Sequence, residues 1–131
     1  MRRQSSDILS LEVPCDRNAP ATVREALAEV DGVGSSLSDG LLVASELVTN
    51  AVLHSGCEMD QLLEVRASLR RDRLMISVHD PGNSGERAQP RREGSELGGW
   101  GVRIVERLAR RWGSERPDGY PVWAELEVRP S

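Results

Sequence analysis

Residues 63–78 read Leu-Glu-Val-Arg-Ala-Ser-Leu-Arg-Arg-Asp-Arg-Leu-Met-Ile-Ser-Val, and this stretch decides the fold. Apolar side chains alternate with polar ones in two runs, over residues 63–69 and again over residues 74–78. Such alternation is typical of a half-buried strand, because successive side chains point to opposite faces of a sheet. The two runs are joined by a tight turn at Arg71-Asp72, so the stretch predicts a β-hairpin with one face on the core.

Further elements flank this hairpin on both sides. Alternation also predicts a first strand over residues 6–13 and a last strand over 122–128. Apolar residues at helical spacing predict helices over residues 19–30, 41–53 and 101–112. The order strand, two helices, hairpin, helix, strand predicts an α+β fold. We expect a two-layer sandwich, with the helices on one face of a mixed, mostly antiparallel sheet.

The composition narrows the class of protein. A chain of 131 residues is long enough for one core and one domain. The net charge of −4 provides no long-range attraction to nucleic acid or to an anionic membrane, so neither is an expected partner. Two cysteines, Cys15 and Cys57, are too few for a disulfide framework, and no export signal follows Met1. We therefore expect a cytoplasmic protein.

All 17 cationic side chains are arginine, and the chain contains no lysine. The P-loop nucleotide fold and the common protein-kinase fold each place a lysine on the phosphates of their nucleotide. Both folds are therefore excluded, and so is a mechanism through a lysine Schiff base.

The helix predicted over residues 41–53 carries a carboxylate, Glu46, and an amide, Asn50, among mostly apolar neighbours. They lie one turn apart and roughly 40° apart around the helix, so they share a face. Burial of an unpaired carboxylate is costly, so a ligand or another part of the protein must compensate it. Two interpretations stay open. The pair is either solvated, or it holds magnesium and phosphates, with Glu46 free to accept a proton.

The hairpin's second strand ends at Asp80-Pro-Gly82. Alternation places Asp80 on the same face as the apolar residues of that strand, so its carboxylate points toward the core. This motif is either an ordinary turn or a site where the carboxylate accepts a hydrogen bond from an adenine amino group. In the second case Gly82 lets a flat ligand approach the backbone closely.

The segment that follows, residues 83–99, is rich in Gly, Pro, Arg, Glu and Ser and predicts a long mobile loop. A loop of this length in a small domain is typical of a lid or a binding loop. It leads to Gly98-Gly-Trp-Gly101 at the start of the last helix, where free backbone N–H groups favour a phosphate. It is not the dinucleotide-binding fingerprint, because no strand immediately precedes it and residue 104 is isoleucine.

In this order and spacing, the three motifs resemble the ATP-binding domain shared by DNA gyrase, histidine kinases, MutL and heat-shock chaperones, which has the Bergerat-type fold. Within that superfamily the chain is most similar to the small stand-alone anti-sigma factor kinases of bacteria, especially the actinobacterial kind. The resemblance runs from about Leu9 to Val128. It implies one ATPase domain over residues 8–131, after a flexible segment over residues 1–7.

The resemblance also implies a role for each motif residue. Asn50 would bind magnesium together with the ATP phosphates, and Glu46 would be the general base. The adenine would lie against Asp80 and Gly82 under a lid from Asn83 to Leu97. The triphosphate would be wrapped by four residues, Gly98, Gly99, Gly101 and Val102. The implied partners are a sigma factor and a small antagonist protein that is phosphorylated on serine or threonine, and a homodimer is compatible with the resemblance.

Two residues depart from the family pattern. Trp100 stands where relatives often have arginine, and Pro121 stands near the place where they commonly have threonine. Pro121 has no hydroxyl and no N–H to offer to a nucleotide. A non-catalytic regulatory module of the same fold is therefore an alternative to a kinase. An isolated histidine-kinase catalytic domain, which would transfer phosphate to histidine, is a third.

Overall fold

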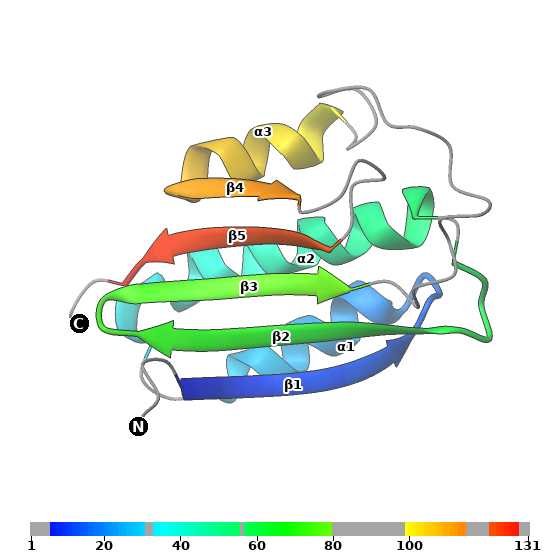
Figure 1. Cartoon of the computed structure of the whole chain (residues 1–131), viewed down its shortest axis with the longest axis horizontal. Helices are drawn as coiled ribbons and strands as arrows, with labels where there is room; N and C mark the ends of the chain where they lie inside the picture. Colours follow the sequence, from blue (N-terminus) through cyan, green and yellow to red (C-terminus); the bar gives the residue numbers. More distant parts are fainter. Residues whose placement is uncertain (1–5, 31–32, 56, 80–98, 115–120, 129–131) are drawn as a thin grey trace.

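The computed structural model describes residues 6–30, 33–55, 57–79, 99–114 and 121–128, with the side chains of residues 6, 35 and 99–102 excepted. The elements follow the chain in the order β1 (Ser6–Pro14), α1 (Ala19–Ala28), η1 (Gly34–Ser36), α2 (Leu37–His54), β2 (Leu62–Arg70), β3 (Arg73–His79), α3 (Gly99–Leu108), β4 (Arg111–Ser114) and β5 (Val122–Glu127). Helices α1 and α2 lie behind the sheet in Figure 1, and no described helix covers its other face, which is called the open face below. The predicted α+β class is confirmed.

The strands form one sheet in the order β1-β2-β3-β5-β4. Every described pairing is antiparallel, whereas the sequence had allowed for a mixed sheet. The predicted hairpin is β2 and β3, which pair from Glu64 with His79 to Arg70 with Arg73. At its turn Arg71 has a φ of 57°, in the left-handed region that favours glycine.

The core lies between the sheet and the two helices behind it. Alternate residues of β2, β3 and β5 point toward the helices, and they are buried as the pattern predicted: Leu63, Val65, Ala67, Leu74, Ile76, Val78, Val122, Ala124 and Leu126. Helix α2 contributes Val43, Leu47 and Val48 to the same core. A Cβ on Gly40 would meet Leu74 Cδ2 at 3.1 Å, so a glycine there lets α2 lie close against β3.

The predicted last helix was too long. Helix α3 ends at Leu108, and the residues from Arg111 to Ser114 form the edge strand β4 instead. The change begins where the Arg110 amide donates a hydrogen bond of 2.7 Å to the Glu125 carbonyl, and it continues with Trp112 paired to Ala124. Pairing with a strand distant in sequence therefore overrides the helical spacing of the apolar residues.

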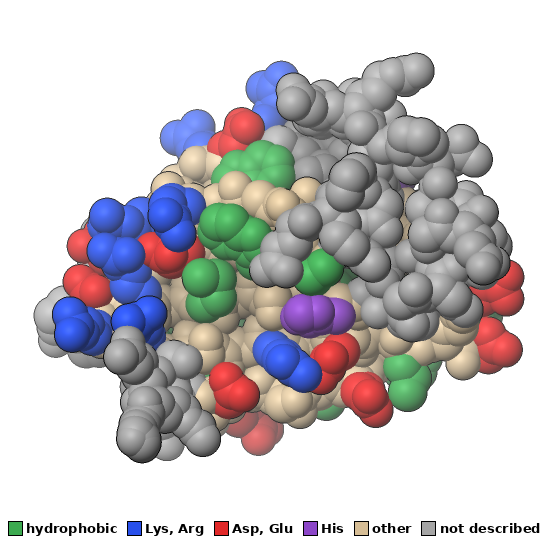
Figure 2. Space-filling model, in the orientation of Figure 1, with side chains coloured by type: hydrophobic (Ala, Val, Ile, Leu, Met, Phe, Trp, Pro, Cys, Tyr) green, Lys and Arg blue, Asp and Glu red, His purple; other side chains and the backbone are tan. Residues whose placement is uncertain are grey.

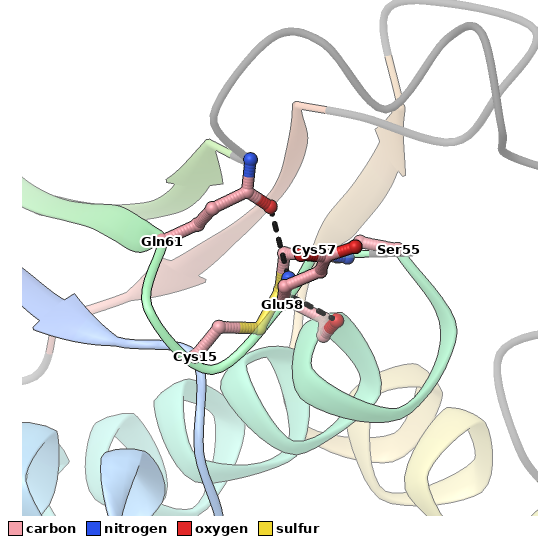
Figure 3. Close-up of a disulfide and its surroundings, with 6 residues drawn as sticks. Cys15, Ser55, Cys57, Glu58 and Gln61 are labelled. Carbon is pink, nitrogen blue, oxygen red and sulfur yellow. Dashed lines mark hydrogen bonds between the residues drawn. A yellow bond between two sulfur atoms is a disulfide. The ribbon is translucent and has the colours of Figure 1, made fainter.

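A single covalent bond ties two of these elements together. Cys15, directly after β1, and Cys57, shortly after α2, are joined by a disulfide (Figure 3). Although two cysteines do not make a framework, the sequence-based expectation missed that they pair. No helix among the described residues is long and apolar enough to span a membrane.

Candidate functional site

Helix α2 presents Asn50 as a buried amide. Its side chain is 6% exposed, and it has no hydrogen-bond partner among the described residues. A side-chain amide offers two donors and one acceptor oxygen, and burial of such a group without partners costs about 1–3 kcal/mol. Because α2 is an otherwise well-packed core helix, this cost indicates a site that is completed by something outside the described residues.

Glu46 lies one turn before Asn50 on the same helix and is half-buried. Its carboxylate forms no ion pair and no hydrogen bond with any described residue. The arginine of α1, Arg24, contacts the neighbouring Ser45 instead: its Nη1 donates a hydrogen bond of 2.9 Å to Ser45 Oγ. Among the described residues, nothing occupies the Glu46 carboxylate, and its role as an acceptor of a proton or a ligand stays a prediction.

The ends of three elements meet at one end of the molecule. The last turns of α2, the end of β3 at His79 and the start of α3 at Gly99 all lie at the right of Figure 1. Helices α2 and α3 also pack against each other, with Val105 of α3 in the core. The described end of β3 and the described start of α3 thus lie toward the end of the molecule where α2 carries Asn50.

The structure places some of the predicted site residues and leaves others outside the described part of the chain. Glu46 and Asn50 share α2, and Gly99 and Gly101 lie in the first turn of α3, so a helix begins at the glycine-rich motif as predicted. The side chain of Val102 is outside the described part of the structure. The remaining predicted residues, Asp80, Gly82 and Gly98, also lie outside the described residues, as does the predicted lid over residues 83–97.

The donors present fit magnesium held by phosphates. Mg²⁺ keeps several waters, and protein sites for it commonly contribute one or two oxygen ligands while a substrate's phosphates provide others. The amide oxygen of Asn50, which has no partner among the described residues, is a suitable ligand of this kind, and the neighbouring carboxylate adds negative charge. The glycine-led N-terminus of α3 offers backbone N–H groups and the positive end of a helix dipole to anionic oxygens.

The hollows formed by described residues lie elsewhere. One, of about 570 Å³, is on the face of the sheet away from α1 and α2 and is lined in part by Arg73 and Glu125. A second, about 350 Å³, also opens on that face and includes His79, Pro121 and Trp123. Pro121 therefore lies on the face of the sheet opposite to the helices. Neither hollow includes Glu46 or Asn50, whose surroundings extend to residues that are not described.

The open face holds a charge cluster that the sequence did not reveal. Glu125 is 4% exposed although alternation had placed it on the uncovered face. Its carboxylate lies 2.9 Å from Arg73 Nη1, 3.5 Å from Arg111 Nη2 and 3.9 Å from Arg110 Nε. Figure 2 shows arginine side chains gathered on the open face, toward the end where the hairpin turns. The many arginines in and next to β3 and β4 could have suggested an ion-pair cluster. Period-two alternation, however, cannot show that three of them surround and bury one glutamate.

Comparison with known proteins agrees with this geometry. Residues 15–125 match the profile of a family described as the histidine kinase-like ATPase domain. No curated protein sequence shows significant similarity to the chain. Among solved structures, the chain is similar to one described as "The crystal structure of the RsbU and RsbW domains of Rv1364c from Mycobacterium tuberculosis".

That likeness extends to sequence as well as to fold. The two chains are 27% identical with a TM-score of 0.58, and the match covers 92% of the present chain but 32% of the other. The present chain thus spans about a third of the length of the chain that it matches.

Proposed function

The chain belongs to the histidine kinase-like ATPase domain family, and from this premise we propose that it is an ATP-binding anti-sigma factor with kinase activity. In this proposal it sequesters a sigma factor and phosphorylates a serine or threonine of a small antagonist protein. The observation that carries the nucleotide site is the buried amide of Asn50, which has no described partner and lies one turn from Glu46. The likeness to a chain described as containing an RsbW domain supports the choice of class.

In the proposed site each residue has a distinct task. Asn50 holds magnesium together with the phosphates, and the metal neutralises charge on them. Asp80 accepts a hydrogen bond from the adenine amine, and Gly82 allows the base to lie close to the backbone. The phosphates receive N–H groups from a segment made up of Gly98, Gly99, Gly101 and Val102. Positioning and charge neutralisation are the main requirements of phosphoryl transfer, so lysine is not needed.

Glu46 acts on the acceptor protein rather than on ATP. Its carboxylate takes the proton of the serine or threonine hydroxyl as that oxygen bonds to the γ-phosphorus. The bond between this phosphorus and the bridging oxygen breaks, and ADP carries the electron pair away. A half-buried carboxylate with no described ion-pair partner suits this task, because no cation among the described residues competes for the proton.

The proposal also covers partners and location. A sigma factor and its antagonist are partners proposed from the family resemblance, as is a homodimer. No direct contact with nucleic acid or a membrane is part of the proposal, and we propose that the protein acts in the cytoplasm.

A regulatory module that binds a partner without transferring phosphate is the second candidate. It is favoured by Trp100, which stands where relatives often have a phosphate-facing arginine. Pro121 supports it less than its sequence position suggested, because its side chain lies with Trp123 on the face opposite to α2.

Two measurements test the proposal. Titration calorimetry with magnesium and a non-hydrolysable ATP analogue should show binding below about 1 mM, as is usual for enzyme substrates. Incubation with γ-labelled ATP and the antagonist encoded beside this chain should then label a hydroxyl residue. An acid-labile product would instead indicate transfer to histidine. Binding without any transfer would support the regulatory module.

Variants separate the two roles of the site. Glu46→Gln should retain nucleotide binding and lose labelling by at least about 100-fold, the usual contribution of a general base. Glu25→Gln, on the exposed side of α1, is the matched control and should leave both unchanged. Undiminished labelling by Glu46→Gln would remove Glu46 from the mechanism.

A further inference from the structure

Cys15 and Cys57 are placed so that one bond connects the end of β1 to the loop after α2. Their Cα atoms are 6.2 Å apart, within the range of about 4.4–6.8 Å that a disulfide bridges without backbone movement. The chain has no other cysteine, so no competing pairing exists within one molecule. The bond therefore forms or breaks as a single event.

Hydrogen bonds fasten the same loop independently of the sulfur atoms. The Cys15 amide donates to the Gln61 carbonyl at 2.9 Å, and the Glu58 amide donates to Gln61 Oε1 at 2.9 Å (Figure 3). The Cys57 amide donates to Ser55 Oγ at 3.2 Å. These bonds hold the two cysteines near each other before any covalent bond forms, which favours rapid and reversible closure.

The two cysteine residues differ in exposure to solvent. Cys15 is 3% exposed, whereas Cys57 is half-buried. A small oxidant or a thiol reductant can therefore reach Cys57, with Cys15 as the partner that completes or releases the bond. Disulfides of reducing compartments are usually transient or redox-sensing, and exposed ones are the more easily reduced.

The bond acts on the turn of α2 that follows Asn50. Cys57 Sγ lies 3.8 Å from the carbonyl oxygen of Ala51, the residue after Asn50. The same carbonyl accepts the Ser55 amide at 3.0 Å, and Ser55 is fully buried. A movement of Cys57 therefore changes its contact with the Ala51 carbonyl, in the last turn of the helix that carries the candidate site.

We propose that Cys15 and Cys57 are an oxidation site whose disulfide clamps the end of α2 and raises the affinity of the site at Asn50 for magnesium-ATP. The effect on affinity rests on the proposed function, whereas the clamp does not. With hydrogen peroxide as oxidant, the Cys57 thiolate attacks one oxygen and becomes a sulfenic acid, while hydroxide leaves and takes up a proton from the solvent to become water. The Cys15 thiol then attacks the Cys57 sulfur, the S–S bond forms, and a second water leaves. A dithiol reductant reverses the change.

The first experiment tests the clamp alone. The full chain is treated with hydrogen peroxide or with dithiothreitol, and its thiols are then alkylated and counted by mass spectrometry. The oxidised monomer should carry no alkyl group and the reduced one two. Amide hydrogen exchange over residues 51–61 should be faster in the reduced form, while exchange in β3 and β5 stays unchanged. Equal exchange in the two forms, or oxidation only between molecules, would overturn the clamp.

The second experiment tests the link to the nucleotide. Reduction should weaken the affinity for magnesium-ATP at least about fivefold, the lower end of typical couplings between sites. Cys15→Ser and Cys57→Ser should bind as the reduced wild type does and should not respond to peroxide. Equal affinity of the oxidised and reduced forms would overturn the link. If neither the oxidised nor the reduced form binds magnesium-ATP, the proposed function is overturned instead. The hydrogen-exchange experiment then still tests the clamp.

Discussion

At the scale of single residues, Asn50 and Glu125 are two buried polar groups with opposite surroundings. Asn50 has no partner among the described residues, whereas three arginines surround the carboxylate of Glu125. A buried group that is fully paired contributes to the fold, while one that is left without partners costs stability and is retained for another reason. We therefore expect substitutions at the two positions to affect stability in opposite directions.

Asn50→Ala should raise the free energy of unfolding by up to about 1 kcal/mol, because alanine is the better helix former and the substitution removes an amide that has no partner among the described residues. The same substitution should abolish the effect of magnesium on ATP binding. Urea unfolding and calorimetry measure the two quantities. Asn18→Ala, at an exposed position before α1, is the control for the loss of an amide. A loss of more than 1 kcal/mol in Asn50→Ala would mean that the amide has a structural partner.

Glu125→Gln should lower the free energy of unfolding by about 1–2 kcal/mol. Loss of one partner of a buried pair can cost more, but the three arginine side chains are about half exposed, so solvent screens part of the effect. Glu64→Gln is the matched control, because Glu64 pairs with Arg66 at 2.8 Å on the same face but in a more exposed place. That variant should change stability by less than about 0.5 kcal/mol. Equal effects in urea unfolding would contradict a special role for Glu125.

At the scale of elements, local patterns were sufficient where the structure itself is local. The hairpin of β2 and β3 follows from alternation and a short turn, and the glycine-led start of α3 follows from its motif. Strand β4 could not be predicted, because its apolar residues also fit helical spacing and only pairing with β5 decides between the two. Burial of Glu125 depends on the same long-range pairing. In the site, the shared face of Glu46 and Asn50 was predictable from helix geometry, while its relation to residues 80–98 stays a prediction.

The hairpin turn offers a test of element geometry. Arg71→Gly should raise the free energy of unfolding by about 0.5–1 kcal/mol, because its φ of 57° is costly for a residue with a Cβ. Asp72, the other residue of the turn, has no positive φ, so Asp72→Gly should lower stability by a similar amount through the entropy of the unfolded chain. Chemical denaturation of both variants measures whether the free energy of unfolding rises or falls in each. A loss of stability in Arg71→Gly would show that the side chain contributes more than its backbone conformation costs.

At the scale of the whole molecule, the sheet order places β1 at one edge of the sheet and β4 at the other. Helix α2 packs against α1, α3 and the middle of the sheet, so it links the N-terminal and C-terminal halves of the fold. The site lies on this central helix, and the disulfide fastens the end of the same helix to β1. Stability of the whole domain and geometry of the site are therefore coupled through the last turn of α2.

This coupling makes the global stability depend on redox state. The bond closes a loop with a sequence separation of 42, for which chain entropy gives about 4 kcal/mol of stabilisation. Reduction of the wild type should therefore lower the midpoint of thermal unfolding by about 15 °C for a domain of this size. Cys15→Ser should unfold at the lower temperature with or without dithiothreitol, which separates loss of the bond from other effects of the reductant. A wild-type midpoint that does not move on reduction would show that Cys15 and Cys57 are unpaired in the folded protein, and the clamp would then have no physical basis.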